Sequence, residues 1–108
     1  MAKVQLDGLR MLDWPSFHAE SQEKFGFPDF YGRNLDAWID CLSGVRDDDG
    51  MSSVALAPDE SLLIEVRDSD ALRIKAPHIL EALQECIEAV NERYAESGEV
   101  PPLQLAFR

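Results

Sequence analysis

Residues 27–44 constrain the fold more than any other part of this sequence. Pro28 disfavours helical geometry in the residue before it, and Gly32 favours a backbone turn that a side chain would strain. Asn34 is suited to cap a helix that ends at Gly44, where we expect a left-handed C-cap. Between these residues the apolar side chains recur at the spacing of an amphipathic helix: Leu35, Trp38, Ile39 and Leu42. The segment therefore predicts a loop followed by a short helix.

Two aspartates, Asp36 and Asp40, lie on one edge of this predicted helix. A separation of four residues places their Cβ atoms about 5–6 Å apart. Like charges at this spacing cost stability unless something outside the chain uses them. The pair is therefore the first candidate for a binding site.

Shorter patterns predict the remaining elements of an α/β fold. We expect strands at 3–6, 61–66 and 103–107, helices at 14–25, 71–74 and 78–95, and a possible short strand at 53–56. The near-continuous apolar run at 61–66 is typical of a central strand that is covered on both faces. Alternation of strands and helices predicts a small, mainly parallel sheet in a single domain over residues 1–108.

Three details of the helix at 14–25 follow from the same patterns. Gly26 is placed to end this helix. His18 falls beside the apolar face, where we expect a hydrogen-bonded or solvated histidine. The apolar face itself is expected to consist of Trp14, Phe17, Ser21 and Phe25.

The composition excludes several classes of protein. The formal net charge of −11 at pH 7 opposes binding to nucleic acid or to an anionic membrane, and it favours a basic partner. The two cysteines, Cys41 and Cys86, and the two histidines lack metal-ligand spacing, so we expect no metal, no cofactor and buried free thiols. No apolar run approaches the length needed to cross a bilayer, and no signal-peptide core is visible, so a cytoplasmic protein is expected.

Several short motifs follow one another without a break in the central segment: the aromatic-aromatic-glycine loop Phe30-Tyr31-Gly32, then Asn34-Leu35-Asp36-Ala37, Trp38-Ile39, Asp40-Cys41-Leu42 and Ser43-Gly44. This order resembles the signature of the barstar-like intracellular ribonuclease inhibitors. The resemblance implies a three-stranded parallel sheet packed against about four helices, in agreement with the predicted elements. Three positions depart from barstar, which has tyrosine in place of Phe30, glutamate in place of Arg33 and tryptophan in place of Ile39.

The resemblance also implies a function and a binding site. It implies a protein inhibitor, monomeric when free, that blocks the active site of a basic ribonuclease by placing carboxylates where RNA phosphates would bind. By position, Asp36 and Asp40 would be the inhibitory pair, and the surrounding contacts would come from Phe30, Tyr31, Gly32, Asn34 and Ile39. A neighbouring acidic helix would add to the face, and the long helix at 78–95 carries a stripe of glutamates: Glu81, Glu85, Glu88, Glu92 and Glu96. Of these, Glu88 and Glu92 are the candidate contacts.

Alternatives to this function remain open. A barstar-fold interaction protein with a non-nuclease basic partner, such as a toxin or a regulatory protein, would present the same acidic face. Catalysis by Asp36 and Asp40 is disfavoured, because neighbours on one exposed helix form a ridge rather than a cleft, and we expect no enzyme. The acidic run that begins at Asp47 does not fit a calcium loop, because the twelfth residue is Pro58 instead of a glutamate.

Overall fold

The computed structural model describes residues 2–47 and 50–108, and within these ranges it contains one three-stranded parallel sheet and four α-helices. Strands β1 (Ala2–Asp7), β2 (Leu62–Arg67) and β3 (Leu103–Phe107) lie in the order β1-β2-β3. Ala2 pairs with Leu62, and Leu62 pairs with Leu103, so β2 is the central strand. The predicted α/β fold and its parallel sheet are confirmed.

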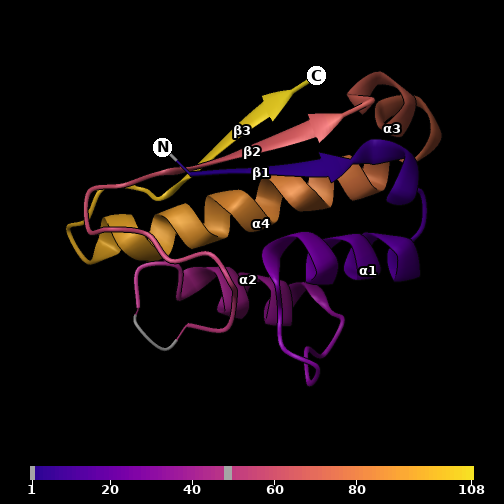
Figure 1. Cartoon of the computed structure of the whole chain (residues 1–108). Coiled ribbons are helices and arrows are strands. Elements are labelled where there is room, and N and C mark those ends of the chain that lie inside the picture. Colours follow the sequence, from indigo (N-terminus) through magenta and orange to yellow (C-terminus); the bar gives the residue numbers. More distant parts are fainter. Residues whose placement is uncertain (1, 48–49) are drawn as a thin grey trace.

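The helices are α1 (Trp14–Phe25), α2 (Leu35–Ser43), α3 (Ser69–Lys75) and α4 (Pro77–Glu96), and a short 3-10 helix, η1 (Gly8–Arg10), follows β1. Figure 1 shows α4 beneath the sheet, α1 and α2 on the same side, and α3 beyond the C-terminal ends of the strands. The core lies between the sheet and these helices, and its largest fully buried side chains include Trp38, Phe17, Phe25, Leu6, Met11 and Leu42.

Within the described ranges no helix lies on the second face of the sheet, so the expected cover of β2 on that face comes from side chains. Glu65 lies at the centre of this face with only 5% of its surface exposed. Three side chains cover its carboxylate: Arg108 donates to Oε2 at 2.7 Å, Gln5 donates to Oε1 at 3.3 Å, and Lys3 forms an ion pair with Oε1 at 3.4 Å. These hydrogen bonds and charges lower the pKa of Glu65. Polar side chains from both neighbouring strands thus take the place of a covering helix.

The two glycines expected to end helices behave differently. Gly26 ends α1, as predicted, and does so in the left-handed conformation with φ 68°. Gly44 has φ −94° and ψ 14°, so the left-handed C-cap predicted for α2 is wrong. The backbone continues instead into a tight turn in which Asp47 N–H donates to the Gly44 carbonyl at 3.0 Å. A Cβ at Gly44 would lie 3.3 Å from the Gly50 Cα, so close backbone approach explains this glycine.

Two further expectations need correction. The sequence predicts Trp14 on the inner face of α1, but 39% of its surface is exposed, because it is the first residue of the helix. Its ring packs against the rings of Phe17, His18 and His78. Residues 53–56 form no strand. The Ser53 N–H and hydroxyl donate to the Phe25 carbonyl at 2.9 and 3.1 Å, and the Leu56 N–H donates to the Val45 carbonyl at 2.7 Å, so hydrogen bonds to two different segments hold this loop. The expected acidic turn lies partly outside the described residues, at 48–49.

Candidate partner-binding site

The contact loop, residues 28–34, is fixed to α1 by polar contacts. Gln22 of α1 donates to the Pro28 carbonyl at 3.0 Å and accepts a hydrogen bond from Arg33 at 3.3 Å. Arg33 has φ 52°, so this residue, and not Gly32, takes the left-handed backbone conformation of the turn. A Cβ at Gly32 would instead crowd the Asn34 amide nitrogen at 3.1 Å. The glycine is therefore explained by its neighbour's side chain rather than by a strained dihedral angle.

The two aromatic residues of the contact loop have opposite roles. Phe30 is 78% exposed, whereas Tyr31 is buried beneath the loop. The Tyr31 hydroxyl lies 2.7 Å from Nδ1 of His18, and the ring packs on Phe27 with centroids 4.8 Å apart. Burial raises the pKa of Tyr31, so the hydroxyl keeps its proton and can donate to Nδ1 of the neutral imidazole. The prediction of a hydrogen-bonded His18 is confirmed, and Tyr31 supports the loop from the core side.

Helix α2 begins where the contact loop ends. The Asn34 side chain accepts from the Ala37 N–H at 2.8 Å, which confirms the predicted N-cap. Trp38 and Leu42 are fully buried, and the indole N–H of Trp38 donates to Ser21 at 3.1 Å, while Ile39 is half-buried. With its inner face fixed in this way, α2 holds Asp36 and Asp40 exposed on its outer edge.

One cation from another part of the chain reaches this acidic edge. Arg93 of α4 donates from Nη1 to Asp40 Oδ1 at 3.0 Å and to the Ser43 hydroxyl at 3.0 Å. The aspartate pair was expected to rely on a partner outside the chain, and for Asp40 the chain itself supplies a counter-ion. Sequence analysis missed this residue because it considered only the glutamates of the long helix. Arg93 lies one full heptad after the buried Cys86, a spacing that puts both on one side of α4.

A small hollow separates the contact loop from the loop that follows α2. Its volume is about 160 Å³, and its lining brings together Phe30, Tyr31, Gly32, Ala37, Asp40, Cys41 and Met51. Met51, at 39% exposure, is an apolar residue that the long loop adds to this surface. The hollow thus places one carboxylate, that of Asp40, beside aromatic and thioether groups.

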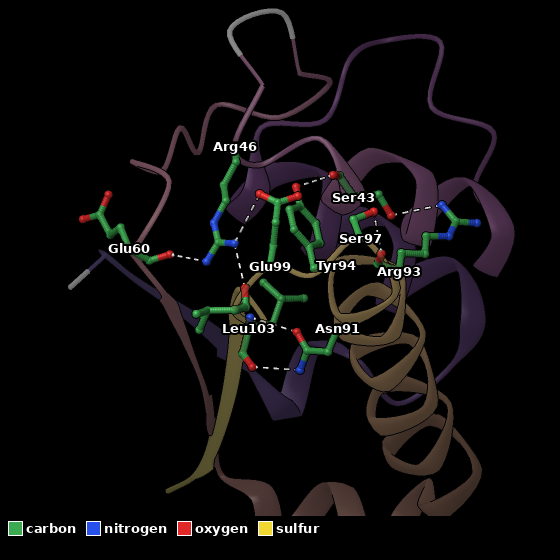
Figure 2. Close-up of polar contacts among 10 residues, drawn as sticks. Ser43, Arg46, Glu60, Asn91, Arg93, Tyr94, Ser97, Glu99 and Leu103 are labelled. Atoms are coloured by element: carbon green, nitrogen blue, oxygen red, sulfur yellow. Dashed lines mark hydrogen bonds and ion pairs between the residues drawn. The ribbon is translucent and has the colours of Figure 1, made fainter.

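Arg46 fixes the first part of that long loop. Its guanidinium donates to the Val100 carbonyl at 2.6 Å and to the Glu60 carbonyl at 3.0 Å, and it lies 5.1 Å from the centroid of the Tyr94 ring. Figure 2 shows these contacts beside the Tyr94 hydroxyl, which donates to the Ser43 carbonyl at 2.5 Å. The end of α2, the loop and α4 are therefore tied together directly behind the acidic edge.

The candidate contacts on α4, Glu88 and Glu92, are exposed. Glu88 follows the buried Cys86 by two residues, which turns it away from the side of the helix that carries Cys86. The structure brings together the contact loop and α2, and a contact role for these two glutamates stays a prediction.

The two cysteines are buried thiols whose pKa values are raised. Burial and the charges of Glu85 and Asp36 raise the pKa of Cys86 to about 11, and burial and Asp40 raise that of Cys41. Both cysteines are free and buried, as predicted. Within 2–47 and 50–108, no three His, Cys, Asp or Glu side chains come together as metal ligands would. In the same ranges no helix combines the length and apolarity needed to span a membrane.

The parallel three-stranded sheet, with α1, α2 and α4 on one side and the loop–α2 segment exposed, defines a small α/β protein of the barstar-like class. The chain belongs to the barstar family: the family model described as "Barstar (barnase inhibitor)" matches residues 1–106. A curated relative, "Putative ribonuclease inhibitor YrdF" of Bacillus subtilis (strain 168), is 46% identical over 44 residues. This match covers 41% of the chain and 48% of the relative, so the chain spans about half the length of the curated relative it matches.

Proposed function

We propose that this protein inhibits a basic ribonuclease by covering its active site with an acidic face. This acidic face consists of seven residues, four from the contact loop and three from α2: Phe30, Tyr31, Gly32, Asn34, Asp36, Ile39 and Asp40. One observation carries the proposal. Asp36 and Asp40 stand exposed on a helix whose other side is fully buried, next to a phenylalanine that is 78% exposed. An exposed aromatic residue beside fixed charges is a typical anchor of a protein–protein interface.

The chemistry of the target explains why such a face would inhibit it. A ribonuclease cleft holds the phosphates of its substrate with cationic side chains, and two carboxylates at fixed spacing match those cations. Attraction between opposite potentials accelerates the encounter, and desolvated charge pairs slow dissociation. Since α2 is already capped and packed, little order has to be gained on binding. In this proposal the carboxylates act as ligands for the partner's cations, and the protein performs no catalysis.

The proposal is tested by capture and by inhibition. We would immobilise the wild-type protein, apply lysate and secreted fractions of the source cells at low salt, and assay the captured material for RNA cleavage with and without added protein. The Asp36→Ala/Asp40→Ala variant should lose the captured ribonuclease, with binding weakened by about 2 kcal/mol or more, roughly thirtyfold. The Glu23→Ala/Asp59→Ala variant removes the same charge from exposed positions outside the face and should bind like wild type.

The outcomes separate the alternatives. Inhibition of a captured ribonuclease that depends on Asp36 and Asp40 supports the proposal. A non-nuclease basic partner that is lost in the same way would keep the face and replace the function by that of an interaction protein. Equal retention by the wild type and the Asp36→Ala/Asp40→Ala variant, with both folded by circular dichroism, would rule out the acidic face as the binding site.

A further inference from the structure

Arg93 of α4 is a cation at the border of the acidic face, where it forms an ion pair with Asp40. Its Nη1 atom lies 3.0 Å from both Asp40 Oδ1 and the Ser43 hydroxyl, and its side chain remains 51% exposed. Figure 2 shows Arg93 reaching from α4 to Ser43, on the far side of Tyr94 from Arg46. The salt bridge therefore lies at the surface, where a bound partner would cover it.

The pairing between Arg93 and Asp40 is incomplete. One nitrogen of the guanidinium meets one oxygen of the carboxylate, instead of the two parallel bonds that arginine can form. In the described part of the chain, Asp40 Oδ2 and Arg93 Nη2 form no hydrogen bond. The carboxylate therefore still has an oxygen that can accept a hydrogen bond from a partner, and the neighbouring guanidinium still has an N–H group that can donate one.

This arrangement restricts the partners that the face can accept. A partner that covers Asp40 also covers Arg93, because the two side chains are in contact. A uniformly cationic surface would then meet Arg93 as a like charge, and a buried cation without a matching group is costly. A surface with an acidic group beside its cations would instead satisfy both residues.

We propose that Arg93 is a specificity-determining residue of the acidic face: it selects a partner that carries an acidic side chain opposite Arg93, next to the cations that meet Asp36 and Asp40. This inference rests on the proposed function for the identity of the partner. The repulsion between Arg93 and a bound cation does not depend on the proposed function, because it can be measured with a simple cationic peptide.

The first experiment measures binding of octa-arginine to the wild type and to Arg93→Gln at low ionic strength by isothermal titration calorimetry. Removal of a like charge about 5–6 Å from the bound cation should tighten binding about threefold. Arg73→Gln is the matched control, since Arg73 also forms an exposed ion pair, with Asp70 at 2.8 Å on α3. Arg93→Gln should raise the affinity for octa-arginine more than the control substitution does. This increase in affinity should be smaller when Arg93→Gln is combined with Asp40→Asn. Equal gains in the two arginine variants would overturn the proposal.

The second experiment uses the captured ribonuclease. Arg93→Gln should weaken this complex while it strengthens the octa-arginine complex, because the acidic group of the partner loses its cation. A tighter complex with the ribonuclease would overturn the proposed acidic group. If no ribonuclease is captured at all, the proposed function fails, and the peptide experiment still decides whether Arg93 opposes cations at Asp40.

Discussion

The contact between His18 and Tyr31 is the point at which the core holds the contact loop. His18 is 5% exposed, and burial together with the charge of Arg33 lowers its pKa. The Tyr31 hydroxyl can donate to Nδ1 only while the imidazole is neutral. Protonation of His18 reverses this hydrogen bond, so that Nδ1–H donates to the hydroxyl, and its cost is the desolvation of a buried cation near Arg33, which links this contact to pH.

We predict that this contact makes stability depend on pH. The pKa of His18 is lower in the folded than in the unfolded state, so the unfolded state binds the proton first. The contribution of neutral His18 to the free energy of unfolding is complete above its pKa in the unfolded state, about 6.5, and it is lost as pH falls through its pKa in the folded state. Between pH 7.5 and pH 5.5 the free energy of unfolding, measured with urea, should fall more for the wild type than for His18→Gln. This variant cannot titrate but keeps an acceptor for Tyr31. An equal loss in both proteins would contradict the prediction.

Arg46 is a buried cation with a specific structural task. Its side chain is 4% exposed, and two of its nitrogens donate to the carbonyl groups of Val100 and Glu60, which lie on separate segments of the chain. We predict that Arg46→Met lowers the free energy of unfolding by about 2–4 kcal/mol, because it leaves the Glu60 and Val100 carbonyls without their donor. Arg73→Met, at an exposed ion pair, should cost less than about 1 kcal/mol. Urea unfolding of both variants decides, and equal costs would refute the role of Arg46.

Single residues also mark what the sequence can and cannot predict. The N-cap at Asn34 and the end of α1 at Gly26 depend on the adjacent backbone, so they could be predicted. The salt bridge between Asp40 and Arg93 joins residues 53 positions apart, and no local pattern specifies it. The contact of Tyr31 with His18 likewise depends on another element, α1.

At the scale of elements, long periodic segments were predicted well and the loop after α2 was not. Helix α4 and strand β3 lie within a residue or two of their expected ranges. Residues 53–56 have the composition of a strand, but their backbone N–H groups donate to Phe25 and Val45, which lie outside the sheet. The apolar run of β2 does not reveal that Lys3, Gln5 and Arg108, and not a helix, cover one of its faces.

The junction between α4 and β3 provides a prediction at this scale. Asn91 accepts from the Leu103 N–H and donates to the Leu103 carbonyl, both at 3.0 Å, so its amide acts as a strand neighbour for the start of β3 (Figure 2). Asn91→Ala should lower the free energy of unfolding by about 1–3 kcal/mol. Asn91→Asp should be less stable at pH 7 than at pH 4, relative to wild type, because only a protonated carboxyl can donate to the carbonyl. Urea titrations at both pH values test this, and the absence of a pH difference would contradict it.

For the whole molecule, the charge is divided between two groups of elements. Helices α1, α2 and α4 together carry nine acidic and two basic side chains. Strands β1 and β2, η1 and α3 together carry three acidic and five basic ones. The three helices, one of which carries Asp36 and Asp40, are thus strongly negative, whereas the second group of elements is slightly positive. A basic partner would be oriented toward these three helices before contact.

This division of charge sets the expected role of the flanking glutamates. Glu88→Gln/Glu92→Gln should slow association with the captured ribonuclease about two- to fivefold and leave dissociation unchanged, because exposed rim charges act mainly through long-range attraction. Stopped-flow measurements at about 50 mM and 500 mM salt should show that the effect disappears at high salt. A dissociation rate that rises about tenfold would show direct contact by these glutamates instead.

The parallel sheet also determines when this protein can first bind during its own synthesis. β1 has no strand to pair with until β2, which starts at Leu62, has been made, and α2 packs mainly on α4, which starts at Pro77. A nascent chain that stops before α4 would carry Asp36 and Asp40 on an unsupported helix, without Arg93. Because most stabilising contacts join distant parts of the sequence, folding is expected to wait for them. Binding competence would therefore arise late in translation, in one step, and not grow with the length of the emerging chain.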